Sequence, residues 1–333
     1  MANKVAIVIL NFNGRSFLEK FLPNVIQNSS PHNIIVADNA STDDSVDFLT
    51  THFPKLKLLQ IPKNYGYAGG YNYALKLILA DYYVLLNSDV ETTSNWIDPV
   101  IKLMESDQSI VACQPKIKSH SHPEFFEYAG AAGGFIDHLG YPFCRGRIFS
   151  QLEKDLGQYN DSIPVFWATG ACLFVKADAF HALGRLDERF FAHMEEIDFC
   201  WRAKNAGKKI YYCGESTVYH VGGGTLKAES PYKTYLNFRN NWLLLYKNLN
   251  EQEFRSVEKL RTKLDLLAAL QFLLKAKRAN ASAILRAHRD FRHMKKPYTQ
   301  AEVSGLSHAE IYPNSLIKQF FIRGKKVFSA LKF

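Results

Sequence analysis

The stretch VAIVIL, residues 5–10, is an uninterrupted apolar run that ends directly in the polar sequence Asn11-Phe12-Asn13. Strand-like and helix-like stretches alternate after it, with strands expected at 34–37, 56–61 and 82–86 and helices at 16–27 and 68–79. Short apolar strands that alternate with helices at this spacing predict a mostly parallel sheet covered by helices on both faces. The sequence therefore predicts an α/β fold of the doubly wound, Rossmann-like type.

Polar side chains follow three of the four predicted strands, at the point where each strand ends. Asn11 and Asn13 come after the first strand, Asp38 after the second, and Asn87-Ser88-Asp89 after the fourth. Ligands of open parallel sheets bind beyond the carboxyl ends of the strands. These residues are therefore candidates for a binding site. A carboxylate at Asp38 can accept the imide N–H of a uracil or thymine ring, although a turn with a helix cap explains the same residues.

A glycine-rich run, NYGYAGGYN at residues 64–72, joins the third strand to the next helix. Its small residues let the backbone approach a ligand at a helix start, so Asn64 and Gly69 are further binding candidates. The run has neither the G-x-G-x-x-G spacing of a dinucleotide site nor the G-K-[ST] of a phosphate loop. A plain glycine-rich turn is an equal alternative.

Two residues are candidates for a metal site. Asp89 can hold Mg²⁺ or Mn²⁺ against a diphosphate, because hard cations take oxygen ligands and keep substrate oxygens in their shell. His220 precedes the glycine run 222–224 and is a second, softer ligand candidate. A capped turn at Asp89 and a structural role for His220 are the alternatives.

The segment FFAHMEEIDFCWR, residues 190–202, places two adjacent carboxylates, Glu195 and Glu196, after a bulky apolar run. A carboxylate near an acceptor hydroxyl is what general-base catalysis needs. The alternative is a helix start, where negative charge meets the positive end of the helix dipole. Asp198 and Arg202 have the spacing of a salt bridge along a helix.

Length and composition indicate a folded, globular protein. A chain of 333 residues with 47% hydrophobic and 22% charged residues can bury a full core. The five cysteines form no C-x-x-C pair, which argues against a zinc site or a disulfide framework and favours a reducing cytosol. No signal-peptide pattern and no apolar run of spanning length is visible. We expect a cytoplasmic protein, with peripheral attachment at the inner face of the cell membrane as an open alternative.

The chain is expected to divide into a catalytic domain at 1–225 and a basic helical extension at 226–333. An irregular insertion rich in glycine, proline and aromatic residues is expected at about 118–160. Residues 227–333 hold 21 Lys/Arg and 8 Asp/Glu, whereas residues 1–226 hold 20 and 24. The stretch LDLLAALQFLLKA at 264–276 predicts a basic amphipathic helix. It fits either an anionic membrane surface or packing against the catalytic domain.

Seven of these stretches, taken in order, resemble family 2 of the glycosyltransferases, with the GT-A fold, and especially its bacterial rhamnosyltransferase-like members. They cover roughly residues 4–225 and read VAIVILNFNG, VADNASTDDSVDFL, NYGYAGGYNYAL, YYVLLNSDVE, TGACLFVKADAF, FFAHMEEIDFCWR and VYHVGGGT. YLNFRNNW, with Asn237, Arg239 and Asn240, resembles the helix that follows the family's catalytic segment, and no chemistry is assigned to it.

The resemblance implies roles for individual positions. Asp38 would contact the nucleotide base, and Asn11 and Asn13 would line the nucleotide pocket. Asp89 stands at the metal-binding end of the family's D-x-D motif, whose first acidic position is Asn87 here. His220 matches a position that can complete the metal shell. Glu196 falls where the family places its catalytic Asp, directly after Glu195, and either glutamate can be the base.

The function that the resemblance implies is inverting transfer of a sugar, rhamnose being one candidate, from a UDP- or dTDP-sugar. The acceptor would be a hydroxyl of a glycan or lipid-linked oligosaccharide in cell-surface polysaccharide synthesis, with Mg²⁺ or Mn²⁺ as cofactor. The alternatives are a nucleotidyltransferase of similar fold, a catalytically inactive protein and a nucleic-acid-binding protein. No recognised nucleic-acid motif is present, so no nucleic-acid partner is expected.

Overall fold

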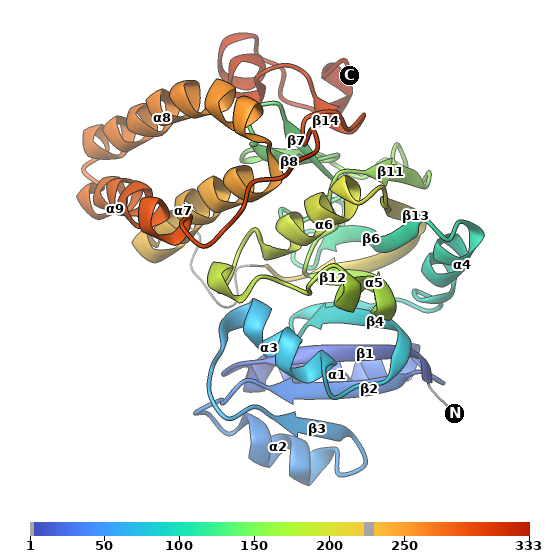
Figure 1. The fold of residues 1–333 in the computed structure, drawn as a ribbon. Helices are drawn as coiled ribbons and strands as arrows, with labels where there is room; N and C mark the ends of the chain where they lie inside the picture. Colours follow the sequence, from blue (N-terminus) through green and yellow to red (C-terminus); the bar gives the residue numbers. More distant parts are fainter. Residues whose placement is uncertain (1–2, 223–229) are drawn as a thin grey trace.

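The computed structural model of the chain describes residues 3–222 and 230–333. Its centre is a nine-stranded sheet in the order β11-β13-β6-β12-β4-β1-β2-β3, with β5 paired to β13 (Figure 1). The strands are β1 (Asn3–Asn11), β2 (Asn33–Asp38), β3 (Lys57–Gln60), β4 (Ala80–Asn87), β5 (Val90–Thr92), β6 (Ile110–Ser119), β11 (Ile163–Val165), β12 (Cys172–Lys176) and β13 (Lys209–His220).

The half of the sheet formed by the first four strands is parallel, as the alternation of strands and helices predicts. β1 pairs with β2 and β4, and β2 pairs with β3, all in parallel. β12 enters antiparallel between β4 and β6, while β13 runs parallel to β6. The complete sheet is therefore mixed, with its parallel half at the amino-terminal end of the chain.

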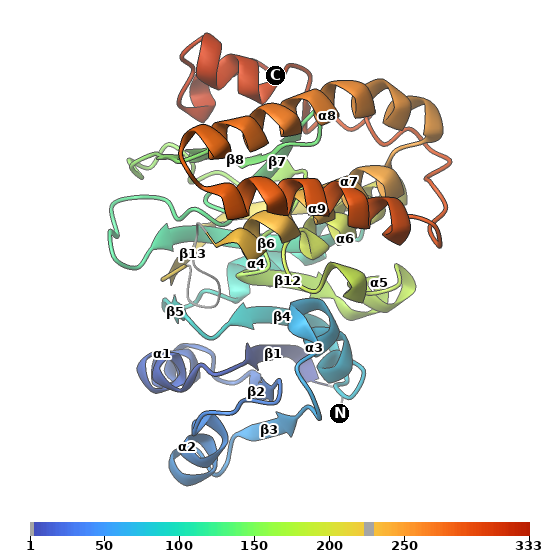
Figure 2. The same cartoon turned by 90° about the vertical axis from the view of Figure 1, so that its left-hand side faces the viewer.

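Helices cover both faces of the sheet, and the alternation of side chains along β1 explains why. Val5, Ile7 and Ile9 join one apolar core with α1 (Arg15–Asn28), α2 (Ser45–His52) and α4 (Asp98–Ser106). Ala6 and Val8 face the other core, with α3 (Gly66–Leu75), α5 (Ala177–Ala182) and α6 (Glu195–Asn205). Successive strand residues point to opposite faces, so the apolar run VAIVIL serves both cores. Figure 2 shows α1 and α2 on one side of the strands and α3 on the other.

The segment expected to be an irregular insertion contains four strands of a second, five-stranded sheet in the order β10-β9-β8-β7-β14. Its strands are β7 (Gly134–Asp137), β8 (Pro142–Cys144), β9 (Arg147–Ile148), β10 (Gln151–Leu152) and β14 (Ile311–Tyr312). Strands this short, separated by glycine turns, leave no alternating pattern long enough to recognise in a sequence. β14 comes from the carboxyl-terminal part of the chain and pairs with β7.

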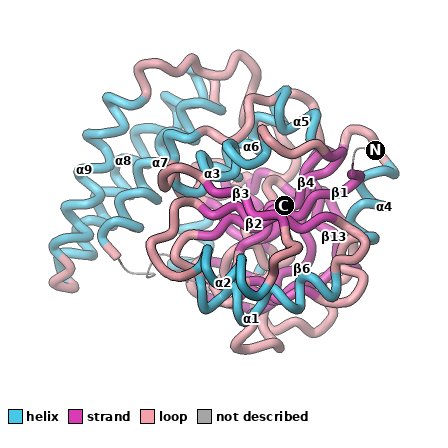
Figure 3. The backbone as a smooth tube through the Cα atoms, turned by 90° about the horizontal axis from the view of Figure 1, so that it is seen from below, coloured by secondary structure: helices cyan, strands magenta, loops and turns pink. Residues whose placement is uncertain are grey.

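Three long helices follow the central sheet: α7 (Pro231–Asn248), α8 (Glu251–Leu274) and α9 (Arg278–Met294). Ser230 caps α7, and Asn250 and Glu253 form a capping box at the start of α8. Figure 3 shows the three helices side by side at one flank of the sheet. Short helical turns lie at Glu188–Phe190, Lys318–Ile322 and Phe328–Ala330. Across the described ranges, the helices are too short or too polar for any of them to cross a bilayer.

Candidate active site

The carboxyl ends of β1 and β2 bring the first candidate residues together. Asn11 lies opposite Asp38 in the sheet register, and its Nδ2 donates to Asp38 Oδ1 at 3.0 Å. Ser41 donates to both carboxylate oxygens, from its hydroxyl at 2.6 Å and from its backbone N–H at 2.9 Å. Both Asn11 and Asp38 are buried. The Asp38 carboxylate is therefore held in one orientation by the end of the neighbouring strand β1 and by the turn that follows β2.

Asn13 organises the loop after β2 from across the sheet edge. Its Oδ1 accepts the backbone N–H of Thr42 at 2.7 Å and of Asp43 at 3.3 Å, while its own N–H donates to Ser41 Oγ at 2.9 Å. The Asn13 backbone has a φ of 52°, a conformation that asparagine tolerates better than most residues. Asn13 thus links the two loops that border Asp38.

Asn64 and Gly69 lie around the start of α3. Asn64 Oδ1 accepts from the Gly66 N–H at 2.8 Å and from Asn39 Nδ2 at 3.0 Å, which ties this turn to the residue after Asp38. At Gly69 an added Cβ would lie 2.7 Å from the Tyr65 Cβ. Its missing side chain therefore makes room for Tyr65. Asn39, which the sequence interpretation did not select, is the residue that connects the two loops.

Asp89, His220 and Glu127 form a buried acidic cluster. His220 Nε2 lies 3.1 Å from Asp89 Oδ1, and His220 Nδ1 lies 3.2 Å from Glu127 Oε2. Asn87 Nδ2 lies 3.3 Å from His220 Nε2. The pairing of β5 with β13 sets Val90 opposite His220 and so brings Asp89 to the histidine. Burial alone would lower the pKa of His220, but hydrogen bonds and charge from Asp89 and Glu127 raise it to about 10.

Glu127 is a functional candidate that the sequence did not reveal. It lies in the segment between β6 and β7, 93 residues before His220, and is buried. No motif surrounds it, and only the fold brings it to the imidazole. No group of three His, Cys, Asp or Glu side chains is arranged as a ready metal site anywhere in 3–222 or 230–333. In this geometry His220 instead bridges the two carboxylates.

Glu195 and Glu196 are the first two residues of α6. Burial, the neighbouring Glu196 charge and the Asp198 charge raise the pKa of Glu195 well above its usual range. Burial raises the pKa of Glu196 to about 7, although backbone N–H groups at the helix start partly offset this. One carboxylate oxygen of each glutamate is buried without a hydrogen-bond partner among the described residues. Both charges also raise the pKa of Tyr67 on α3, after the larger effect of its burial.

The loop before these glutamates has an unusual backbone. Phe191, His193 and Met194 have φ angles of 66°, 70° and 74°, in the left-handed region that non-glycine residues seldom adopt. Strained backbone of this kind persists only where surrounding contacts impose it, and it is concentrated at functional sites. We call residues 189–194 the glutamate loop.

Two neighbouring helices hold the glutamate loop in place. Asn240 Nδ2 on α7 lies 2.7–3.0 Å from the carbonyl oxygens of Phe190, Ala192 and His193. Arg239 donates to the carbonyl oxygens of Arg189 and Phe190 at 3.1 and 2.9 Å. On the other side, the Tyr67 N–H of α3 donates to the Phe191 carbonyl at 2.8 Å.

Asp198 connects α6 to α7. The predicted pair with Arg202 is present, with 2.8 Å between Arg202 Nε and Asp198 Oδ2. Lys247 and Asn248 of α7 also donate to this carboxylate, at 2.8 and 3.0 Å. Burial would raise the pKa of Asp198, but the charges of Arg202 and Lys247 hold it below its usual value. The carboxylate is therefore a buried junction between the two helices.

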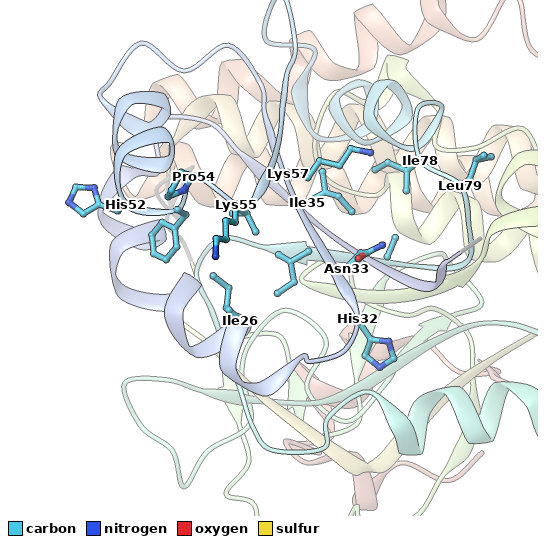
Figure 4. Close-up of a pocket in the computed structure, with 14 residues that line it drawn as sticks. Ile26, His32, Asn33, Ile35, His52, Pro54, Lys55, Lys57, Ile78 and Leu79 are labelled. Atoms are coloured by element: carbon cyan, nitrogen blue, oxygen red, sulfur yellow. The ribbon is translucent and has the colours of Figure 1, made fainter. Parts of the chain in front are cut away.

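A separate hollow of about 770 Å³ lies at the amino ends of β2 and β3, where Asn33 and Lys57 begin these strands. Figure 4 shows its apolar wall, including Ile26, Ile35 and Leu79. The candidate residues named above lie at or beyond the opposite, carboxyl ends of the strands. The hollow therefore has no part in the site.

The chain has the GT-A fold of glycosyltransferases. It is similar to TarS 1–349 of S. aureus in complex with UDP-GlcNAc, with a TM-score of 0.57 and 15% identity, covering 86% of this chain and 80% of that chain. It is also similar to GalNAc-T7 with UDP, GalNAc and Mn²⁺, with a TM-score of 0.56 and 15% identity. That likeness covers 73% of this chain and 48% of GalNAc-T7.

Residues 6–184 match the model of glycosyl transferase family 2, and the chain belongs to this family. It is 26% identical to N-acetylglucosaminyl-diphospho-decaprenol L-rhamnosyltransferase of Mycobacterium tuberculosis over 239 residues, which cover 66% of this chain and 76% of that protein. It is 23% identical to rhamnosyltransferase WbbL of Escherichia coli, covering 62% and 80%. The rhamnosyltransferase-like family and fold predicted from the ordered motifs are thus confirmed.

Proposed function

We propose that this glycosyltransferase moves a sugar, rhamnose in the first instance, from a dTDP- or UDP-sugar to a hydroxyl of a lipid-linked or free glycan acceptor, with inversion at the anomeric carbon. The reaction would serve cell-surface polysaccharide synthesis. The names of the mycobacterial and E. coli relatives support the sugar, and the mycobacterial name supports an acceptor built on a lipid diphosphate. The observation that carries the chemistry is Glu196, a carboxyl group with a pKa of about 7 at the start of α6.

Glu196 supports the role of general base because its pKa lies near neutrality, where a base both ionises and accepts a proton effectively. Its carboxylate would take the proton of the acceptor hydroxyl as that oxygen attacks the anomeric carbon. The bond from this carbon to the diphosphate oxygen breaks on the opposite face, which inverts the configuration. Glu195, whose pKa is raised further, would stay protonated beside it.

Asp38 would recognise the pyrimidine. Its Oδ1 accepts from Asn11 and from the Ser41 hydroxyl, whereas Oδ2 accepts, among the described residues, the Ser41 N–H alone. A carboxylate oxygen has two acceptor positions. Oδ2 thus keeps one for the imide N–H of uracil or thymine, while Asn13 and Asn64 shape the loops beside it. This arrangement supports a pyrimidine nucleotide.

In this geometry His220 bridges Asp89 and Glu127, and the three side chains carry donor atoms that a divalent cation takes once the imidazole has lost its proton. Asp89 and Glu127 supply oxygen donors and His220 supplies a nitrogen donor, a set that suits Mn²⁺ or Mg²⁺ better than a thiolate site would. Asp89 and His220 would hold the ion, with Glu127 beside them. When bound, the cation supplies positive charge that offsets the charge developing on the leaving diphosphate.

Ligand-dependent stabilisation followed by a transfer assay tests this function. We expect dTDP or UDP with Mn²⁺ to raise the Tm, because a ligand that binds only the folded state stabilises it. GDP should raise it less, and transfer from dTDP-rhamnose should stop on chelation and return with added Mn²⁺. The proposal fails if neither pyrimidine nucleotide stabilises the protein more than GDP, or if transfer is indifferent to chelator.

A further inference from the structure

One face of α8 exposes an unusual set of leucines. We call it the leucine face, and it consists of Leu260, Leu266, Leu267, Leu270, Leu273 and Leu274, which are between 45% and 81% exposed. The opposite face of the same helix is buried through Phe254, Val257 and Ala269. The helix is therefore packed on the protein through its other face, and the exposed leucines do not contribute to that packing. Contiguous exposed apolar surface of this kind marks a contact with a partner or a membrane.

The charges around the leucine face indicate which partner it takes. Between residues 259 and 289 the chain has eight Lys or Arg residues and a single acidic residue, Asp265. Asp265 is buried, with its Oδ2 2.8 Å from Trp242 Nε1 and 2.9 Å from His288 Nε2. Exposed cations border the leucines on α8 and at the start of α9, at Lys259, Lys263, Lys275 and Arg278. Exposed leucines bordered by Lys and Arg are typical of a helix that lies on anionic lipid.

The leucine face lies at the same end of the helical layer as the active site. Asn280 Nδ2 of α9 donates to Thr234 Oγ1 in the first turn of α7 at 2.8 Å, next to Lys233. Lys233 lies close enough to Glu127 and His193 for its charge to act on both. Figure 1 shows α8 at the margin of the molecule, with the turn between α8 and α9 projecting away from the sheet.

We propose that the leucine face docks this glycosyltransferase onto an anionic lipid bilayer, with the leucines among the acyl chains and the bordering cations at the headgroups. The docking extends the proposed function, because it sets the active site beside a membrane-borne acceptor. Only the identity of the acceptor in this proposal rests on the proposed function; binding to the bilayer does not. Lipid binding itself is measured without any transfer reaction, so the two proposals fail separately.

Vesicle flotation of the full chain tests the docking. Vesicles of phosphatidylcholine alone are compared with vesicles that contain about a third phosphatidylglycerol. We expect binding to the anionic vesicles, weakened by added salt. The triple substitution Leu267→Gln, Leu270→Gln and Leu274→Gln should reduce the bound fraction about tenfold or more, because the apolar contact that inserts is removed.

A matched control comes from the far side of the molecule. Leu77 and Leu79, after α3, are 56% and 83% exposed, so Leu77→Gln with Leu79→Gln replaces two exposed leucines away from α8. This control should float like the unmodified protein, and both variants should keep its Tm. The double substitution Lys263→Glu and Lys275→Glu should reduce binding to the anionic vesicles and leave binding to the phosphatidylcholine vesicles unchanged.

The proposal is overturned if the unmodified protein does not float with anionic vesicles, or if the triple variant floats equally well. It is also overturned if the unmodified protein sediments as a dimer that the triple variant abolishes while neither binds vesicles. That result would assign the leucine face to a second copy of the chain.

Discussion

The two adjacent glutamates of α6 differ in a way that decides which one can act as a base at neutral pH. Glu195 is only 3% exposed, and burial together with its neighbour's charge raises its pKa strongly. Glu196 is more exposed, and its pKa is raised only to about 7. The less buried of the two therefore gives up its proton first and is available for proton abstraction.

The pH dependence of turnover follows from this assignment. Because the folded-state pKa of Glu196 is raised, its carboxyl group is protonated and inactive at acidic pH and becomes a base as the pH rises through about 7. We expect kcat at saturating donor to rise roughly tenfold per pH unit below that value and to level off above about pH 8.

Substitution separates the two glutamates. Glu196→Gln should lower kcat by roughly 10²–10⁴-fold and remove the rising limb, with donor KM almost unchanged. Glu195→Gln replaces a carboxyl group that is already protonated with another uncharged group. It should therefore lower kcat much less than Glu196→Gln does. A profile that stays flat between about pH 5.5 and 8, or a rising limb that survives in Glu196→Gln, would contradict the assignment.

At the scale of elements, the position of Glu196, the proposed base, depends on contacts between α7 and the glutamate loop. The glutamate loop, whose three left-handed residues each cost about 1–3 kcal/mol, is held through backbone carbonyls by Asn240 and Arg239. Because α6 begins where this loop ends, α7 determines where Glu196 lies. We therefore expect Asn240 and Arg239 to act as positioning residues for the proposed base.

Asn240→Ala should lower kcat about 10–100-fold, with little change in donor KM, because the loop relaxes and the base moves away from the acceptor. Asn240→Asp is nearly isosteric but has no N–H to donate, so it should be at least as damaging. The control is Asn241→Ala, which loses a buried contact to the Gly140 carbonyl and none to the loop.

Steady-state kinetics and thermal unfolding, measured on all three variants, separate positioning from folding. Asn241→Ala should lower stability by about 1–3 kcal/mol while kcat is kept. If Asn241→Ala and Asn240→Ala lose kcat equally, the effect is general destabilisation and α7 does not position the base.

Elements with a strong local pattern could be predicted from the sequence, and contacts set by topology could not. The apolar run at 5–10 and the strand-like runs that follow it predict the parallel half of the sheet. Polar residues at the strand ends predict the edge of the sheet where Asn11 and Asp38 meet. Glu127 meets His220 only because distant strands pair, and β7 to β10 are too short to show a period. Arg239 and Asn240 lie in YLNFRNNW, which resembles a helix of the family, but nothing in the sequence indicates which residues they contact.

At the scale of the whole molecule, the carboxyl-terminal part is built into the rest of the structure. β14 pairs with β7 of the second sheet, and Tyr312 packs against Phe143 and Phe333 with ring centroids 6.1 and 5.2 Å apart. Lys247 and Asn248 meet Asp198 of α6. Contacts spread along the chain in this way favour one cooperative unit over separate unfolding of 1–225 and 226–333.

Calorimetry measures this cooperativity. We expect a single unfolding transition, and we expect Tyr312→Ala, which removes a buried ring, to destabilise that whole transition by about 3–5 kcal/mol. Tyr232→Ala, at a residue that is 45% exposed, should change the stability by less than about 1 kcal/mol. Two transitions, of which Tyr312→Ala shifts only one, would show that the extension unfolds independently.

Gly66 has a consequence that reaches from one end of the site to the other. It adopts a φ of +72°, and an added Cβ would lie 2.5 Å from the Phe191 carbonyl oxygen. On its other side, its N–H and carbonyl are held by Asn64 and by Asn39, the neighbour of Asp38. The Asn39–Gly66 hydrogen bond and the Tyr67 N–H donated to the Phe191 carbonyl therefore connect the residue after Asp38, the proposed nucleobase ligand, to the loop that precedes the proposed base. We infer that a nucleobase bound in the wrong position also displaces the proton acceptor. The enzyme would then discriminate between donors in the rate of the transfer step as well as in donor binding.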